Sequence, residues 1–586
     1  MIRFLIDDKK INEALCELVS ELPAAKELDI SVSFERSDVE KGLAVRKNGN
    51  NWCVSYTDNA SLMRGVALAV QSAYEGKSEE ICETPLFGTL GIMLDVSGNA
   101  VMKPSALRRY CRLMAVLGYN TLVLKTVNGS CITADADMES FAGRYSAEEL
   151  RELDSYAKAL GITLVPCVQF SELPLFNGAE ELGGVIDNIL SVLSENLTGR
   201  RICFGFDRPP FPGCGPYPTP VGNCPEEDLP KYMEVICDLC KKYGYEITVG
   251  SGVLDCSEAY DDVTYAVSEC TSVKCDDYRA LLRSLSEKTQ NVGFVGGDNS
   301  WYGAVPLSWL SHTVACNTLP ALKELPPKEV YIAVWRDDTG AAPFFSTLPV
   351  LFAYAETCYA HTDYTEHLSR RMLALCGVDF YDMVPLEDIP AIRCRMNTGR
   401  IIVNPAKYML YDDIIDGAFA AHSTGARRHL RCMTEWMAER IERSGEFAYI
   451  FEAQVAFCDL LACKYEISEG FRREYKNKDR AAMQKTCDVR FDRAIDAVDR
   501  FAQKLRAQWE IECMDFGMEL IEERLELVKS RIAKGKAPIA DYLSGKTDKM
   551  DFYESEAKPY AHEEGLIHDR NAILINDFEA IIKGNN

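Results

Sequence analysis

Histidine, long apolar runs and the usual hydrolase signatures are scarce or missing in this chain. It has 7 histidines in 586 residues, none of them in an H-E-x-x-H motif, and it has no G-x-S-x-G elbow. These absences remove support for a zinc protease or a serine hydrolase. No run of about 18 apolar residues occurs, so no membrane-spanning helix is predicted. Residues 1–10 show neither a long apolar stretch nor a small-residue cleavage site, so no signal peptide is predicted.

Positive charge is also in short supply. The chain has 64 Lys and Arg against 89 Asp and Glu, which gives a formal net charge of −25. Because phosphate contacts need Lys and Arg, this balance argues against nucleic acid as a partner. A neutral sugar or a cationic group would suit such a field better than a polyanion.

Cysteine is plentiful, with 23 residues scattered along the chain. Without a secretory signal, this usage predicts free thiols and a cytoplasmic location. Cys237 and Cys240 form a C-x-x-C pair, which could hold a metal or act as a redox pair. They fall in a predicted helix over residues 228–243, with no second such pair nearby. We interpret them as thiols packed against the core, and predict neither a metal nor a cofactor.

Strand and helix signals alternate from about residue 89 to 360. Gly118 and Gly161 stop two helices, and Ser146 with Glu149 forms an S-x-x-E capping box before the second of them. Eight short apolar segments are predicted as strands: residues 89–96, 120–127, 162–169, 201–207, 246–250, 263–267, 291–296 and 329–335. Apolar strands separated by helices indicate an α/β fold, a closed (β/α)8 TIM barrel. The competing open, doubly wound sheet would usually carry a Gly-rich phosphate loop after its first strand, and none is present there.

The segments on either side of the barrel have different patterns. Residues 1–85 read as a small α/β domain, residues 86–395 as the barrel, and residues 396–586 as a helical domain. Six helices are predicted outside the barrel, at residues 12–22, 59–74, 424–443, 448–465, 476–510 and 517–534.

Several motifs resemble a known family. LDVSGNAVMK (94–103), GRYSAEELRELDSYAKALGI (143–162) and VPCVQ (165–169) are similar to intracellular-type β-N-acetylhexosaminidases of glycoside hydrolase family 20. VNPAKYMLYDD (403–413) and the DFGMELIEERLELVKSRI segment from residue 515 resemble the helical C-terminal region of the same subgroup. The resemblance implies an exo-acting glycosidase in which the 2-acetamido oxygen of the substrate attacks the anomeric carbon.

The general-acid Glu of this family is absent from the end of the fourth strand. The family carries an Asp that orients the acetamide, followed by a Glu that is the general acid. Asp207 stands at the Asp position, but Arg208 stands at the Glu position. Arginine cannot deliver a proton at working pH, because its pKa lies above about 12. The two residues could also form a simple ion pair.

Other positions depart from the family as well. Gly98 replaces the Arg that grips the sugar hydroxyls after strand one, and Glu172 replaces the His expected after strand three. Gly250 and Gly252 stand where strand five usually has a Trp and an Asp. These changes remove many of the side-chain contacts to the sugar that the resemblance would imply.

Side chains at the carboxyl ends of barrel strands build the site in folds of this type. We predict Asp207 as a catalytic residue, paired with one of three other carboxylates: Glu172, Asp298 and Asp337. Carboxylates beside aromatic walls suit a sugar. The predicted substrate-binding residues are Asp95, Asn99, Lys125, Arg208, Trp301, Tyr302 and Trp335.

The alternatives at these positions stay open. Asp337 with Asp338 could cap the last helix, and Lys125 with Arg208 could receive an anionic sugar such as a sulfated or uronic one. The leading hypothesis is an exo-acting glycoside hydrolase of the hexosaminidase type with altered acid/base residues and altered sugar specificity. The alternative is a catalytically inactive carbohydrate-binding relative. The expected partner is a small carbohydrate, with no membrane and no nucleic acid, and a homodimer is possible.

Overall fold

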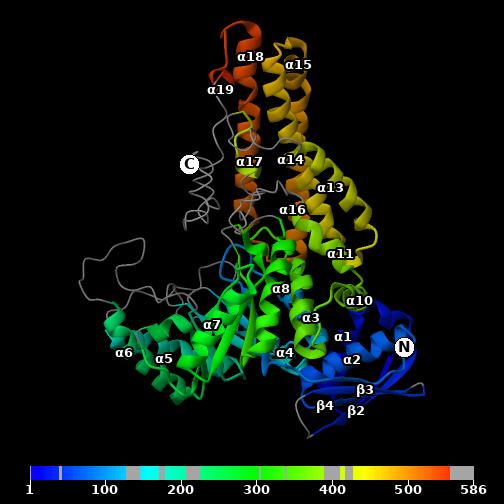
Figure 1. Cartoon of the computed structure of the whole chain (residues 1–586), viewed down its shortest axis with the longest axis vertical. Helices are drawn as coiled ribbons and strands as arrows, with labels where there is room; N and C mark the ends of the chain where they lie inside the picture. Colours follow the sequence, from blue (N-terminus) through cyan, green and yellow to red (C-terminus); the bar gives the residue numbers. More distant parts are fainter. Residues whose placement is uncertain are drawn as a thin grey trace. The chain divides into compact units, whose positions relative to one another are not determined.

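The chain divides into two compact units (Figure 1). The barrel unit comprises Met1–Asn299, Ser311–Trp335 and Thr347–Phe380. The helical unit comprises Ser300–Leu310, Arg336–Ser346 and Tyr381–Asn586. The structure is a computed structural model, and it describes residues 2–37, 42–49, 51–126, 145–169, 178–205, 225–255, 257–302, 305–336, 339–388, 409–415 and 426–554.

Eight parallel strands close into a barrel in the order β10-β11-β12-β13-β6-β7-β8-β9. Their bounds are β6 (Thr89–Asp95), β7 (Thr121–Lys125), β8 (Thr163–Val168), β9 (Arg201–Phe204), β10 (Glu246–Gly250), β11 (Val263–Ser268), β12 (Val292–Gly297) and β13 (Glu329–Val334). The strands are apolar along most of their length because helices cover one face and the barrel core covers the other. This confirms the predicted (β/α)8 barrel and each of its eight strands.

Side chains that point inward fill the barrel, as expected for a packed core rather than a pore. The buried cluster comprises Met93, Val123, Val165, Cys167, Cys203, Ala266, Val295, Tyr331 and Ala333. Trp335, the residue directly after β13, packs against this cluster from the carboxyl end and is partly buried.

The amino end of the barrel is closed by a polar layer. Arg201, the first residue of β9, donates to Glu329 Oε1 at 2.6 Å and to the Tyr331 hydroxyl at 2.8 Å. Thr248 donates to the other oxygen of Glu329 at 2.9 Å. Because these groups satisfy one another at the amino end, the strand ends that can meet a ligand are the carboxyl ends.

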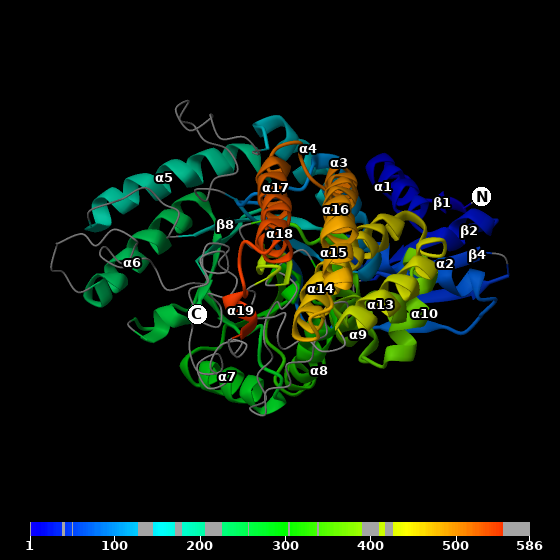
Figure 2. The same cartoon turned by 90° about the horizontal axis from the view of Figure 1, so that it is seen from above.

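Helices surround the strands, and α5 and α6 lie side by side in both views (Figure 1 and Figure 2). Their bounds are α3 (Pro104–Leu117), α4 (Ala147–Ala159), α5 (Gly178–Asn196), α6 (Pro225–Tyr243), α7 (Cys275–Lys288), α8 (Ser308–Glu324), α9 (Leu348–Ala360) and α10 (Thr365–Cys376). The link from β10 to β11 contains the short 3-10 helix η5 (Ser251–Asp255).

Two local signals read from the sequence have the predicted geometry. Ser146 Oγ accepts from the Glu149 backbone N–H at 3.2 Å, and Glu149 accepts from the Ser146 backbone N–H at 2.8 Å, which completes the capping box. Gly118 ends α3 at φ +86°. A Cβ there would lie 2.7 Å from the Tyr359 ring, so both the backbone angle and the packing require glycine.

Cys237 and Cys240 are both buried in α6. Burial raises the pKa of Cys237 to about 11 and that of Cys240 to about 12, so both thiols stay protonated at neutral pH. In the part of the chain that the structure describes, no three His, Cys, Asp or Glu side chains gather as a metal site would require. No helix within the described ranges is long and apolar enough to cross a membrane.

A five-stranded sheet precedes the barrel in the order β1-β2-β4-β3-β5. Its elements are β1 (Ile2–Leu5), α1 (Lys9–Ser20), η1 (Pro23–Glu27), β2 (Ile30–Arg36), β3 (Leu43–Asn48), β4 (Asn51–Tyr56), α2 (Asn59–Tyr74) and β5 (Ile81–Glu83). The sheet lies in the same compact unit as the barrel. The domain boundaries at residues 85 and 395 stay predictions.

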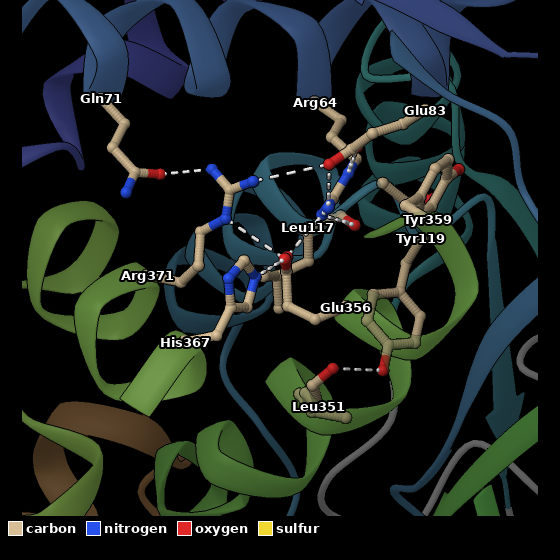
Figure 3. Close-up of polar contacts among 11 residues, drawn as sticks. Arg64, Gln71, Glu83, Leu117, Tyr119, Leu351, Glu356, Tyr359, His367 and Arg371 are labelled. Atoms are coloured by element: carbon tan, nitrogen blue, oxygen red, sulfur yellow. Dashed lines mark hydrogen bonds and ion pairs between the residues drawn. The ribbon is translucent and has the colours of Figure 1, made fainter. Parts of the chain in front are cut away.

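A buried ionic network joins this sheet region to the barrel helices (Figure 3). Arg64 of α2 bonds Glu83 at 2.5 Å and Glu356 of α9 at 2.9 Å. Arg371 of α10 contacts Glu356 at 3.2 Å, and His367 lies 2.6 Å from the same carboxylate. The side chains of Arg64 and Glu356 are 1% and 0% exposed, so each charge depends on its partners for compensation.

The helical unit is built mainly of helices. Its elements are α11 (Phe380–Met383), η8 (Val384–Asp388), α13 (Ala426–Ile441), η10 (Gly445–Phe447), α14 (Ala448–Lys476), α15 (Arg480–Lys485), the π-helical turn η11 (Thr486–Arg490), α16 (Phe491–Glu512), α17 (Met518–Lys534), α18 (Lys536–Ser544) and α19 (Asp551–Glu554).

The predicted boundaries around residues 465 and 476 are wrong. Helix α14 continues to Lys476 because its apolar face continues through buried Ile467, Phe471 and Tyr475. The chain then turns at Lys478, which has φ +54°, and Asp479 caps the next helix. The π-helical turn interrupts the segment predicted as one long helix.

Candidate active site

Three of the predicted site residues meet at the carboxyl end of the barrel. Asp95 ends β6, Lys125 ends β7, and Trp335 directly follows β13. Lys125 Nζ lies 3.2 Å from Asp95 Oδ2 and 5.7 Å from the centre of the Trp335 ring. The strand register explains the meeting, because Asp95 pairs with Lys125 across β6 and β7, and β13 is the other neighbour of β6.

Asp95 is held by local contacts as well as by the ion pair. Its Oδ1 accepts from the Ser97 backbone N–H at 3.0 Å and from Ser97 Oγ at 2.6 Å. The Asp95 and Lys125 side chains are 8% and 18% exposed, so the pair is largely shielded from water. The sequence motifs did not point to Ser97 as a partner of Asp95. The signal was present, because an Asp followed two residues later by a Ser is a known turn pattern.

Gly98 and Asn99 complete this turn. A Cβ on Gly98 would meet nothing within 4 Å, so there is open space at this position. Asn99 is half-buried. Its predicted contact with a substrate stays a prediction.

Asp298 follows β12 but is nearly inaccessible, with 1% exposure. Its backbone N–H donates to the Ala333 carbonyl at 2.9 Å, which continues the sheet ladder by one residue. Asn299, next in the chain, donates from Nδ2 to the Cys270 carbonyl at 3.0 Å and from its backbone N–H to Ser311 Oγ at 2.7 Å. These contacts hold the strand end, and the catalytic role predicted for Asp298 stays a prediction.

Two other acidic side chains near the strand ends have structural contacts. Glu269 Oε1 accepts from the backbone N–H groups of Thr271 and Ser272, at 2.7 and 2.9 Å, and so caps a turn. Asp255 forms an ion pair with Lys288 at 3.2 Å.

Several predicted site residues fall outside the described residues. These are Asp207, Arg208, Glu172 and Asp337. Trp301 and Tyr302 lie in the short 3-10 helix η6 (Asn299–Tyr302), whose backbone is described but whose tryptophan and tyrosine side chains are not. The structure therefore brings together Asp95, Lys125 and Trp335 from the predicted set.

The Asp95–Lys125 pair predicts a measurable coupling. Replacing Lys125 by Met leaves the shielded Asp95 carboxylate without its cation, and should cost about 1–3 kcal/mol of the free energy of unfolding. Adding Asp95→Asn should recover part of this loss, because the uncompensated charge is then gone. Denaturant unfolding of both single variants and the double variant measures the coupling. Strictly additive effects would contradict a direct pair.

A family profile matches part of the chain. Residues 379–571 match the glycoside hydrolase 20C C-terminal domain. No protein of curated function matches the sequence.

Solved structures resemble the chain at low sequence identity. A GH138 enzyme targeting pectin rhamnogalacturonan II is 10% identical with a TM-score of 0.55, and the match covers 92% of this chain and 99% of that one. A GH20 exo β-N-acetylglucosaminidase from Vibrio harveyi is 14% identical with a TM-score of 0.48, covering 66% and 74%. The GH20 β-N-acetylhexosaminidase from Streptomyces coelicolor A3(2) is 16% identical with a TM-score of 0.47, covering 64% and 90%.

The match to the GH138 enzyme, at a TM-score of 0.55, shows a shared fold, and the profile identifies the C-terminal region. The described barrel carries the predicted strand-end residues Asp95 and Lys125, and the helical unit holds most of the matched C-terminal domain. The chain therefore combines a closed eight-stranded barrel with a region, residues 379–571, that matches the glycoside hydrolase 20C C-terminal domain.

Proposed function

We propose that the chain is an exo-acting glycoside hydrolase, similar to β-N-acetylhexosaminidases but with altered acid/base residues and altered sugar specificity. The observation that carries the proposal is the meeting of Asp95, Lys125 and Trp335 at the carboxyl ends of adjacent barrel strands. This is the end of the barrel at which enzymes of this fold place their chemistry.

The chemistry of the three side chains suits a sugar. A carboxylate accepts hydrogen bonds from hydroxyl groups, an ammonium donates them, and an indole ring packs against the apolar face of a pyranose. Because Asp95 already compensates the charge of Lys125 at 3.2 Å, this part of the site favours a neutral sugar over an anionic one. An anionic sugar would then depend on Arg208.

The altered acid/base arrangement rests on the sequence. Arg208 stands at the general-acid position, so Asp207 needs a second carboxylate if the chain turns over a glycoside. Asp298 at 1% exposure is poorly placed to exchange a proton with a substrate. We therefore favour Glu172 or Asp337 as the partner of Asp207.

A non-catalytic sugar-binding protein is the second candidate. The open space at Gly98 favours this candidate, because the family's Arg that contacts the sugar hydroxyls is absent there. The aromatic side chain of Trp335, which could pack against a sugar, is present. Such a protein would bind a sugar and leave its glycosidic bond intact.

Turnover and binding separate the two candidates. The purified chain would be assayed against aryl N-acetylhexosaminides, plain hexosides and uronides, with calorimetric titration of the corresponding free sugars. Turnover of any one of them supports the glycosidase. Sugar binding without turnover supports the second candidate, and the absence of both overturns both.

A further inference from the structure

Gln169 places a buried polar side chain at the carboxyl end of the barrel. It directly follows β8, and its side chain and backbone together are only 4% exposed. Side chains at these strand ends are the ones that build sites in (β/α)8 barrels. Buried polar groups in folded proteins almost always have hydrogen-bond partners, so the partners of this amide need to be identified.

The amide of Gln169 faces the interior of the barrel. Successive side chains of a strand point to opposite faces, and Val165 and Cys167 of β8 both belong to the buried cluster inside the barrel. Gln169 continues this series by one step. Its Nε2 lies 3.9 Å from Cys167 Sγ, which places the amide on the same side of the strand. The side chain therefore lies above the core cluster, at the end of the barrel where a ligand can enter.

The strand register brings Gln169 next to the Asp95–Lys125 pair. Cys167 pairs with Lys125 on β7, and Lys125 pairs with Asp95 on β6. Gln169 occupies the next inward-facing position after Cys167, on the strand adjacent to that of Lys125. The ammonium of Lys125 and the amide of Gln169 thus belong to neighbouring strand ends of the same site.

The hydrogen-bonding capacity of this amide is largely unused. Within the described ranges, its one polar contact is the 3.9 Å approach of Nε2 to Cys167 Sγ. Sulfur is a weak acceptor, whereas a carboxamide has two N–H donors and an oxygen that can accept twice. Strand β9 adds no side chain on the other side, because Cys203 pairs with Cys167 and the residue two beyond Cys203 is Gly205. Burying an amide in this way costs stability, and proteins accept such a cost mainly at functional sites.

We propose that Gln169 is a further substrate-binding residue, whose amide exchanges hydrogen bonds with a neutral substituent of the sugar, a hydroxyl or an acetamido group. The inference rests on the proposed function and deepens it, because it adds the chemistry by which the site recognises its substrate. An amide both donates and accepts, as those substituents do, and it carries no charge to attract a carboxylate or a sulfate. Together with Lys125, whose charge Asp95 compensates at 3.2 Å, it suits this side of the site to a neutral sugar.

The substitution Gln169→Met tests the inference, because methionine keeps the length of glutamine but has no donor and only a weak acceptor. Gln454→Met is the matched control, since Gln454 is a buried glutamine of α14 in the helical unit and has no part in the proposed site. Calorimetric titration with N-acetylglucosamine, glucose and glucuronic acid measures affinity. KM on the corresponding aryl glycosides is the second measure for any sugar that is cleaved. Thermal unfolding without sugar reports on the fold.

We expect Gln169→Met to weaken binding of the neutral sugar about tenfold, and to raise KM in the same proportion with kcat changed much less. A loss with both N-acetylglucosamine and glucose would indicate a contact to a shared hydroxyl, and a loss with N-acetylglucosamine alone would indicate the acetamido group. The unfolding midpoint of Gln169→Met should equal or exceed that of the wild type, because the change removes a buried polar group with few hydrogen bonds. Gln454→Met should leave sugar affinity at its wild-type value.

The outcomes separate this inference from the proposed function. If the wild type binds or cleaves a neutral sugar and Gln169→Met does so equally well, the inference fails and the proposed function stands. Failure of Gln169→Met to fold, or an unfolding midpoint below that of the wild type, would assign the amide to the fold and overturn the inference. Tighter binding of glucuronic acid than of either neutral sugar would also overturn it. A wild-type chain that neither binds nor cleaves any of these sugars would overturn both.

Discussion

Replacing Glu356 by glutamine is expected to lower the free energy of unfolding by about 3–5 kcal/mol, because breaking a buried ion pair leaves an uncompensated charge. Glu356 contacts Arg64 at 2.9 Å and Arg371 at 3.2 Å, and its side chain is fully buried. Among the described residues, Glu83 would then be the carboxylate left in contact with the Arg64 and Arg371 guanidinium groups. Denaturant unfolding followed by circular dichroism measures the loss.

The control and the pH dependence sharpen this test. Asp29→Asn breaks an exposed pair with Arg3, with side chains 73% and 63% exposed, and should change the free energy of unfolding by less than about 0.5 kcal/mol. Burial alone would raise the pKa of Glu356, but Arg64 and Arg371 outweigh it and hold the pKa below its ordinary value of 4.5.

The sign of the pH effect follows from that lowered pKa. A carboxyl whose folded pKa lies below its unfolded value stabilises the fold above the unfolded value, and loses this contribution as pH falls. The difference between wild type and Glu356→Gln should therefore be full at pH 7 and shrink below about pH 4.5. A difference that grew on acidification would contradict the network.

Asp207→Asn is expected to lower kcat/KM on any aryl glycoside that the chain cleaves, by about 100-fold or more. The resemblance assigns to this position the carboxylate that orients and polarises the acetamide of the substrate. Asparagine has the same shape but no charge, so it cannot stabilise positive charge that develops in the transition state. Initial rates on the active member of the glycoside panel measure the loss.

The control for Asp207→Asn is a carboxylate on the outside of the barrel. Asp187 of α5 forms an exposed pair with Lys242 at 2.6 Å, so Asp187→Asn should leave kcat/KM unchanged. If Asp207→Asn kept wild-type turnover, Asp207 would not be the catalytic carboxylate. Glu172 and Asp337 would then be exchanged in turn.

Much of the barrel could be predicted because its signals are local. The capping box of Ser146 and Glu149 and the stop at Gly118 involve residues close in sequence, and each has the geometry that its residue types demand. Strand rhythm is local as well, since a strand covered on both faces must be apolar along most of its length. The helix predicted from residue 476 begins instead at Arg480, because the chain turns at Lys478, where no Gly or Pro marks the turn.

The candidate site could be predicted only as a set of strand ends. The motif resemblance singled out Asp95 and Trp335, and the strand-end position singled out Lys125. That the Lys125 ammonium pairs with Asp95 and lies over the Trp335 ring depends on barrel closure and on the strand register. Burial of Asp298 could not be read from the sequence, because a strand-end Asp has the same local pattern whether it faces solvent or protein.

By itself, the sequence determined that this protein forms a closed barrel. It also predicted a site at the strand ends, with Arg208 where the resemblance leads one to expect an acid. The spacing of apolar residues, the helix caps and the identity of each residue are properties of short segments. They can therefore be read without a structure. Only the tertiary structure decided which charges meet. Arg64 and Glu356 are 292 residues apart. Such pairs cannot be read from a short stretch of sequence, because the partner that compensates a buried charge is brought to it only by folding.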